Sequence, residues 1–78
     1  MPHVIVKLWP GRTEEQKKDL TDRIVKAVME VIKAPENAVS VGFEEIPRER
    51  WDVEVYQPDI VGKEKTLYKK PGYKPEKA

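Results

Sequence analysis

The most constraining feature of the sequence is an amphipathic helix that stands between two short apolar strands. Residues 13–33 begin with the spacing of a capping box, in which the Thr13 oxygen accepts from the amide of Gln16 and the Gln16 side chain reaches back. Apolar residues then recur at helical spacing, at Leu20, Ile24, Ala27, Val28 and Val31. Pro35 disfavours helical geometry at the residue before it, so we expect the helix to end near Lys33.

The segments on either side of this helix are typical of β-strands. Residues 4–9 are mostly β-branched or large and are followed by Pro10-Gly11, and residues 39–44 alternate apolar and polar side chains before Ile46-Pro47. In the first strand, one face carries Val4, Val6 and Leu8 and the other carries Ile5, Lys7 and Trp9. This order predicts an α/β fold, a β-α-β unit whose two parallel strands are joined by one right-handed crossover helix.

A single helix covers only one face of such a sheet, and the other face also carries apolar residues. The chain has 78 residues, and domains below about 70–80 residues rarely gain more than ~3–5 kcal/mol from one core. With no Cys, no disulfide adds to that stability. We therefore expect self-association to complete the sheet.

The last third of the chain is ambiguous. Residues 52–56 alternate like a strand, whereas Pro47 and the four-residue spacing of Trp51 and Val55 favour a short helix, which is our prediction. Residues 69–78 are expected to be irregular, because their four Lys are interspersed with Pro71, Gly72 and Pro75. We expect one domain over residues 1–78, with a core at 2–51 and a C-terminal extension at 52–78.

Composition limits the classes of function. The chain has 15 Lys and Arg against 14 Asp and Glu, so its formal net charge is +1. This balance argues against nucleic-acid binding, because nucleic-acid binders concentrate positive charge to displace counterions. The lack of Cys and the single His exclude thiolate and multi-histidine metal sites, so no metal site of these kinds is expected. No apolar run approaches the ~20 residues that span a bilayer and no signal peptide is evident, so we expect a cytoplasmic protein without a membrane partner.

Pro2 is the most informative single residue. A small residue at position two permits removal of Met1, which leaves a proline secondary amine at the terminus. That amine is a base near neutral pH when apolar surroundings or nearby cations lower its pKa. Proline at this position is also common in proteins with no such chemistry, so the rest of the pattern decides its meaning.

Three motifs occur together in the first half of the chain. Pro2 begins a strand, residues 11–17 (Gly-Arg-Thr-Glu-Glu-Gln-Lys) open the helix, and Ala34-Pro35 precedes a Val-rich strand. Over residues 2–51 this combination resembles the 4-oxalocrotonate tautomerase family. The C-terminal run 67–73 (Leu-Tyr-Lys-Lys-Pro-Gly-Tyr), together with His3 and Trp51, is similar to the small subgroup labelled PptA.

The resemblance implies a role for individual residues. Pro2 matches the catalytic proline, which moves a proton between carbon and oxygen of an enol or dienol; Arg12 matches an arginine that binds a substrate carboxylate. Trp51 lies where the family has an aromatic pocket wall. The family's second arginine falls at Ser40, which cannot bind a carboxylate by charge but can donate a hydrogen bond to a substrate oxygen.

The missing positive charge has two candidate sources, Arg48 and Arg50, from the same or a neighbouring subunit. The resemblance then implies a cofactor-independent isomerase acting on a small 2-oxo or 2-hydroxydienoic acid. The PptA-like tail favours a homodimer, whereas similarity to the shorter oxalocrotonate enzymes implies a hexamer.

Two alternatives stay open at this point. One is a dehalogenase or hydratase of the same superfamily, in which a protonated proline acts as an acid and Glu44, Glu45 or Glu54 activates water. The other is a non-catalytic β-α-β interaction module, which Ser40 in place of an arginine favours, as would an unprocessed Met1.

Overall fold

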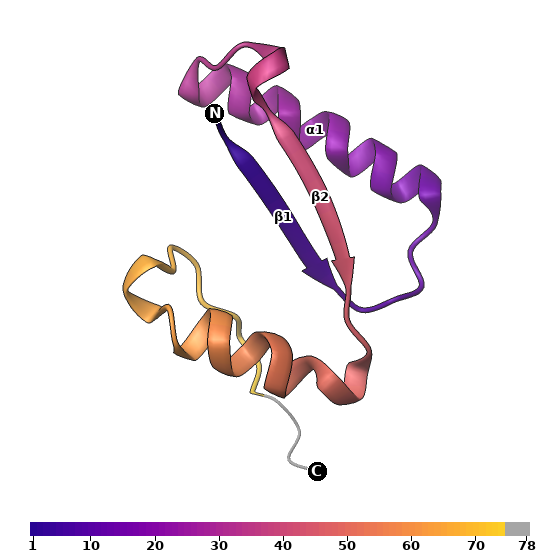
Figure 1. The fold of residues 1–78 in the computed structure, drawn as a ribbon, viewed down its shortest axis with the longest axis vertical. Coiled ribbons are helices and arrows are strands. Elements are labelled where there is room, and N and C mark those ends of the chain that lie inside the picture. Colours follow the sequence, from indigo (N-terminus) through magenta and orange to yellow (C-terminus); the bar gives the residue numbers. More distant parts are fainter. Residues whose placement is uncertain (75–78) are drawn as a thin grey trace. The chain divides into compact units, whose positions relative to one another are not determined.

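The computed structural model describes residues 1–74, and the chain forms two compact units, residues 1–45 and 46–78. The first unit consists of β1 (His3–Leu8), α1 (Glu14–Ile32) and β2 (Ser40–Glu45) (Figure 1). The two strands pair in parallel, with His3 opposite Ser40 and Leu8 opposite Glu45. The predicted α/β fold, with two parallel strands joined by one helix, is confirmed. That residues 1–78 act as one domain stays a prediction.

Local sequence explains both ends of α1. The Thr13 hydroxyl accepts from the Gln16 N–H at 3.1 Å and the Gln16 side-chain oxygen accepts from the Thr13 N–H at 2.9 Å, so the predicted capping box is complete. After the last turn, Lys33 adopts the left-handed conformation, with φ 66°, and its N–H donates to the Met29 carbonyl. The helix thus satisfies backbone groups at each end that would otherwise lack a partner.

The helix α1 covers one face of the two-stranded sheet. Phe43 of β2 lines a hollow together with Lys17 and Thr21 of α1, and the Lys17 Nζ lies 2.9 Å from a Glu45 carboxylate oxygen. Because successive side chains of a strand point to opposite faces, Phe43 and Glu45 face α1 and Ser40 faces away from it. The strand register places Val4, Val6 and Leu8 on the same side as Phe43.

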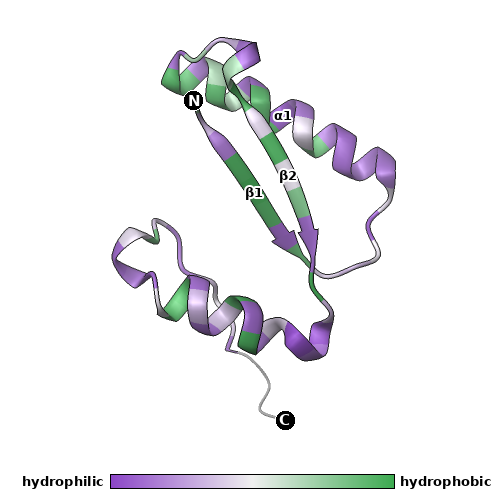
Figure 2. Ribbon diagram, viewed as in Figure 1, coloured by the Kyte–Doolittle hydropathy of each residue, from purple (hydrophilic) through white to green (hydrophobic). Residues whose placement is uncertain are grey.

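Within residues 1–45, no second element covers the other face of the sheet. Ile5 lies on that face opposite Gly42, and Ile5 and Trp9 are each 48% exposed. Figure 2 shows that β1 is mostly hydrophobic, that β2 has hydrophobic residues in its middle and hydrophilic ones at its end, and that the N-terminal half of α1 is largely hydrophilic. Val31 and Ile32 at the end of α1 are also exposed. This unit therefore leaves apolar surface open on both the sheet and the helix.

The second unit is helical, as predicted for this part of the chain. A short 3-10 turn at Arg48–Arg50 leads into a π-helix at Asp52–Val61 (η3), followed by another 3-10 turn at Glu64–Thr66. At the end of this π-helix, the Gly62 N–H donates a hydrogen bond at 2.8 Å to the carbonyl of Gln57, five residues earlier. Residues 69–74 form no helix or strand, as predicted, and residues 75–78 lie outside the described part of the chain.

Few side chains are deeply buried. Across residues 1–74 the buried apolar side chains are Ile46, at 6% exposed, and Val55, at 5%. A chain with so small a core gains little stability from burial alone. None of the helices over these residues is both long and apolar enough to cross a membrane.

Gly11 provides a test of the turn between β1 and α1. Its φ of 120° is a conformation that side chains with a Cβ disfavour, although open space surrounds the Cβ position. We expect Gly11→Ala to lower the free energy of unfolding by more than about 1 kcal/mol, measured by urea denaturation. Gly72→Ala is the control, because Gly72 has equally open surroundings and no positive φ. Equal stability of the two variants would contradict a strained turn.

Candidate active site

Pro2, His3 and Ser40 come together where the two strands begin. The Ser40 backbone N–H donates to the Pro2 carbonyl at 3.1 Å. The Nδ1 atom of His3 lies 2.6 Å from the Ser40 hydroxyl oxygen, and both side chains are exposed. Parallel pairing of His3 with Ser40 explains both contacts. Two of the predicted site residues, Pro2 and Ser40, are therefore neighbours within one chain.

Arg12 lies at the opposite end of β1 from Pro2 (Figure 1). The six residues of β1 extend over about 20 Å, at ~3.3 Å per residue. Arg12 is exposed, and among residues 1–74 it has no hydrogen bond or ion pair. Gly11 and the Thr13 cap shape the backbone on either side of it. One chain therefore holds its proline and this cation far apart.

The other three predicted site residues belong to the second unit. Arg48 is exposed, and Arg50 forms an ion pair with Glu54 four residues further along the chain. The Trp51 indole N–H donates to the Tyr73 hydroxyl at 2.9 Å. Arg48, Arg50 and Trp51 thus gather at the start of this unit, and the Trp51 ring is held by a residue from its end.

Sequence reasoning missed Tyr73, which lies in a segment interpreted as an irregular tail. Its ring also packs against Tyr56, with centroids 5.9 Å apart and planes inclined by 47°. A tilted pair at this distance is a favourable arrangement for two aromatic rings. The only local signal for this role was an aromatic residue after Pro71-Gly72.

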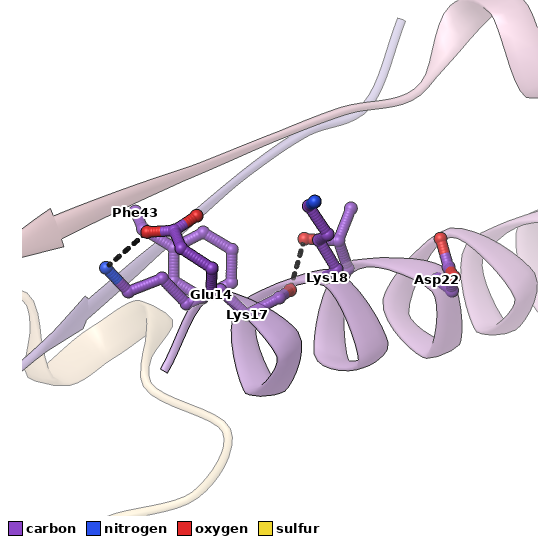
Figure 3. Close-up of a pocket in the computed structure, with 6 residues that line it drawn as sticks. Glu14, Lys17, Lys18, Asp22 and Phe43 are labelled. Atoms are coloured by element: carbon purple, nitrogen blue, oxygen red, sulfur yellow. Dashed lines mark hydrogen bonds and ion pairs between the residues drawn. The ribbon is translucent and has the colours of Figure 1, made fainter. Parts of the chain in front are cut away.

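A hollow lies on the helix side of the sheet, away from Ser40 (Figure 3). It is lined by Glu14, Lys17, Lys18, Thr21, Asp22 and Phe43. The hydrogen bond that Lys17 donates to Glu45, with the nearby Glu14 carboxylate, raises the pKa of Lys17 above its ordinary value. A reactive lysine needs a lowered pKa. None of the predicted site residues lines this hollow, which we interpret as structural.

Two of the carboxylates considered for activating water are held in ion pairs. Glu45 pairs with Lys17, and Glu54 pairs with Arg50. Within residues 1–74, no three His, Asp or Glu side chains are grouped so as to hold a metal ion.

Comparison with known proteins identifies the family. The sequence model of the family described as "Tautomerase enzyme" matches residues 2–57. A probable tautomerase of Xylella fastidiosa is 42% identical over 73 residues, which cover 94% of this chain and 89% of that protein. This chain belongs to the tautomerase family. It is therefore an enzyme of the isomerase class, and the non-catalytic module is not supported.

Two further relatives place this tautomerase within the family. Tautomerase PptA of Pectobacterium atrosepticum is 40% identical over 74 residues, covering 94% of this chain and 97% of that protein. The crystal structure of YwhB, a homologue of 4-oxalocrotonate tautomerase, superposes with a TM-score of 0.63 at 37% identity, over 69% of this chain and 88% of that one. The resemblance to the 4-oxalocrotonate tautomerase family and the tautomerase fold are confirmed.

The bond between Trp51 and Tyr73 predicts a measurable effect on stability. Tyr73→Phe removes the hydroxyl that accepts the indole N–H and keeps the ring that packs on Tyr56. We expect the free energy of unfolding to fall by about 0.5–1.5 kcal/mol, measured by urea denaturation. Tyr68→Phe is the matched control, because Tyr68 is fully exposed. An equal, negligible effect in both variants would show that the bond does not stabilise the protein.

Proposed function

We propose that this tautomerase interconverts the keto and enol forms of a small 2-oxo or 2-hydroxydienoic acid, with Pro2 as the general base. The observation that carries the proposal is the position of Pro2. It immediately precedes β1 inside the segment matched by the family, and its carbonyl accepts a hydrogen bond from the Ser40 N–H. No metal or other cofactor takes part in the proposed reaction.

The reaction needs a free proline amine, so Met1 is removed in the active enzyme. The Pro2 nitrogen takes the proton from the enol oxygen as the C=O bond forms, and returns it to carbon as the C–H bond forms. Negative charge passes through the substrate during this transfer, so hydrogen-bond donors and cations around its oxygens lower the barrier. Exclusion of water strengthens these interactions.

Arg12 is proposed to bind the substrate carboxylate, together with a second copy of the chain. The separation of about 20 Å along β1 is too large for a small acid to contact Pro2 and Arg12 of one chain. In the proposed assembly, Arg12 of a neighbouring copy lies near Pro2 of the first chain, so that one substrate can contact both residues. Ser40 is proposed to donate a hydrogen bond to the substrate, Arg48 and Arg50 to add positive charge, and Trp51 to wall the pocket.

Self-association is supported by the apolar surface that the chain leaves open. After removal of Met1, the exposed large apolar residues of the first unit are Ile5, Trp9, Leu20, Val31 and Ile32. A two-stranded sheet with one helix is marginal by itself, and covering its free face stabilises it. We propose a homodimer, with a hexamer as the alternative assembly. No membrane or nucleic-acid partner is proposed.

The role of Pro2 is tested with Pro2→Ala. Ala at position two also permits removal of Met1, so the variant differs in the amine and the ring alone. We expect ketonisation of phenylenolpyruvate, followed by ultraviolet absorbance, to slow by about 100-fold or more, the typical contribution of a general base. The control is circular dichroism showing an unchanged fold, and intact mass must show that Met1 is absent. Unchanged turnover in this sample would exclude Pro2 as the base.

The role of Arg12 and the shared site are tested by mixing two variants. Arg12→Ala is expected to raise KM for a carboxylate substrate, and its own turnover at low substrate should be small. When Pro2→Ala and Arg12→Ala chains are refolded together, mixed dimers regain one intact site. The mixture should then recover about a quarter of the wild-type rate, as symmetry of a dimer requires.

The mixing experiment has a clear negative result. A rate no greater than that of the two variants measured separately would contradict a site formed by two chains. An unaltered KM in Arg12→Ala would remove Arg12 from the site whatever the mixture does. Lys26→Gln serves as the matched control in both experiments, because it neutralises an exposed cation of α1.

A further inference from the structure

The pair formed by His3 and Ser40 is a polar feature on the open face of the sheet. The two residues are 37 positions apart in the chain, yet their side chains lie 2.6 Å apart between Nδ1 and Oγ. Both are exposed, and the backbone of Ser40 is bonded directly to that of Pro2. The pair therefore lies at the same end of the strands as the proposed catalytic proline.

The pair is not required to hold the two strands together. The backbone ladder already aligns β1 with β2 from His3 opposite Ser40 to Leu8 opposite Glu45. One side-chain hydrogen bond adds little to the strand pairing beside this backbone ladder. A role for the pair is therefore better sought in what it offers to a ligand.

The surface beside Ser40 is open. Gly42 follows two positions later on β2 and lies on the same face, and no atom lies within 4 Å of the position where a Cβ would stand. In a single chain, the Ser40 side chain is therefore accessible from this face of the sheet.

The hydrogen bond between His3 and Ser40 determines whether the Ser40 hydroxyl can donate to a substrate. A hydroxyl has one O–H to donate and two lone pairs to accept with. When the His3 Nδ1 carries the proton, it donates to Oγ and leaves the Ser40 O–H directed elsewhere. Carboxylate and keto oxygens only accept hydrogen bonds. Such an oxygen at this site therefore requires a Ser40 O–H that is not donated to His3.

We propose that His3 is a positioning residue, which donates from Nδ1 to Ser40 and so directs the Ser40 hydroxyl toward a substrate oxygen. The site then has a neutral donor at its Pro2 end. This inference rests on the proposed function, because it takes Ser40 to be in contact with the substrate. His3 itself does not touch the substrate and acts through Ser40.

A double-mutant cycle on KM tests this coupling. Ser40→Ala and His3→Leu should each raise KM for phenylenolpyruvate by about three- to tenfold, with kcat changed much less. The double variant should be no worse than Ser40→Ala alone, because His3 acts through the hydroxyl. His3→Asn should restore most of the loss, since its side-chain amide places a donor near the position of Nδ1. Lys26→Gln is the control and should leave KM unchanged.

A spectroscopic measurement tests the same inference without turnover. The chain has a single His, so enzyme labelled with ¹⁵N-histidine gives one set of imidazole signals. Long-range ¹H–¹⁵N correlation should show a protonated Nδ1 that changes in Ser40→Ala. Adding phenylpyruvate, the keto product, should shift these signals in the wild type and much less in Ser40→Ala.

The two experiments separate failure of this inference from failure of the proposed function. Additive losses in the cycle, no rescue by His3→Asn, or a neutral ring protonated on Nε2 alone would each overturn the role of His3. If Pro2→Ala is inactive while His3→Leu and Ser40→Ala keep the wild-type KM, the tautomerase mechanism stands and the pair has no part in it. If Pro2→Ala is fully active, the general-base mechanism fails, and the imidazole response to phenylpyruvate still decides whether His3 and Ser40 form a ligand site.

Discussion

The parallel pairing of β1 with β2 is the constraint on which the proposed site depends. His3 and Ser40 are 37 positions apart in the chain, and the pairing places them opposite each other. It also allows the Ser40 N–H to donate to the Pro2 carbonyl. A shift of one residue would turn the Ser40 side chain to the helix side of the sheet and remove it from the open face. Pro2, His3 and Ser40 are neighbours because the backbone ladder has this register.

In the proposed mechanism, the same pairing also explains why one chain does not form the whole site by itself. Parallel strands require a long crossover, and here that crossover contains the turn with Arg12, at the far end of β1 from Pro2. One helix covers one face, so Ile5 and Trp9 on the other face stay half exposed. A second copy answers both requirements, since it covers apolar surface and brings a cation toward the proline. In this proposal, assembly and catalysis have a common structural cause.

The second unit contains aromatic side chains that contact one another. The Trp51 N–H is bonded to the Tyr73 hydroxyl, and Tyr73 packs on Tyr56, so the end of this unit supports a residue at its beginning. The ion pair of Lys70 with Glu64, at 2.8 Å, joins the same terminal segment to the turn before it and lowers the pKa of Glu64. The irregular segment 69–74 therefore contributes to the structure through its side chains, without forming a helix or strand.

The sequence by itself determined the elements and the family. The capping box of Thr13 and Gln16, the helical spacing up to Val31 and the alternation after Val39 are local patterns, and the forces behind them act between residues close in the chain. Pro2 and Arg12 could be chosen as candidates because each lies in a recognisable motif. Only the tertiary structure decided which candidates meet. The contacts of His3 with Ser40 and of Trp51 with Tyr73 depend on strand register and chain reversal, which no short stretch of sequence encodes.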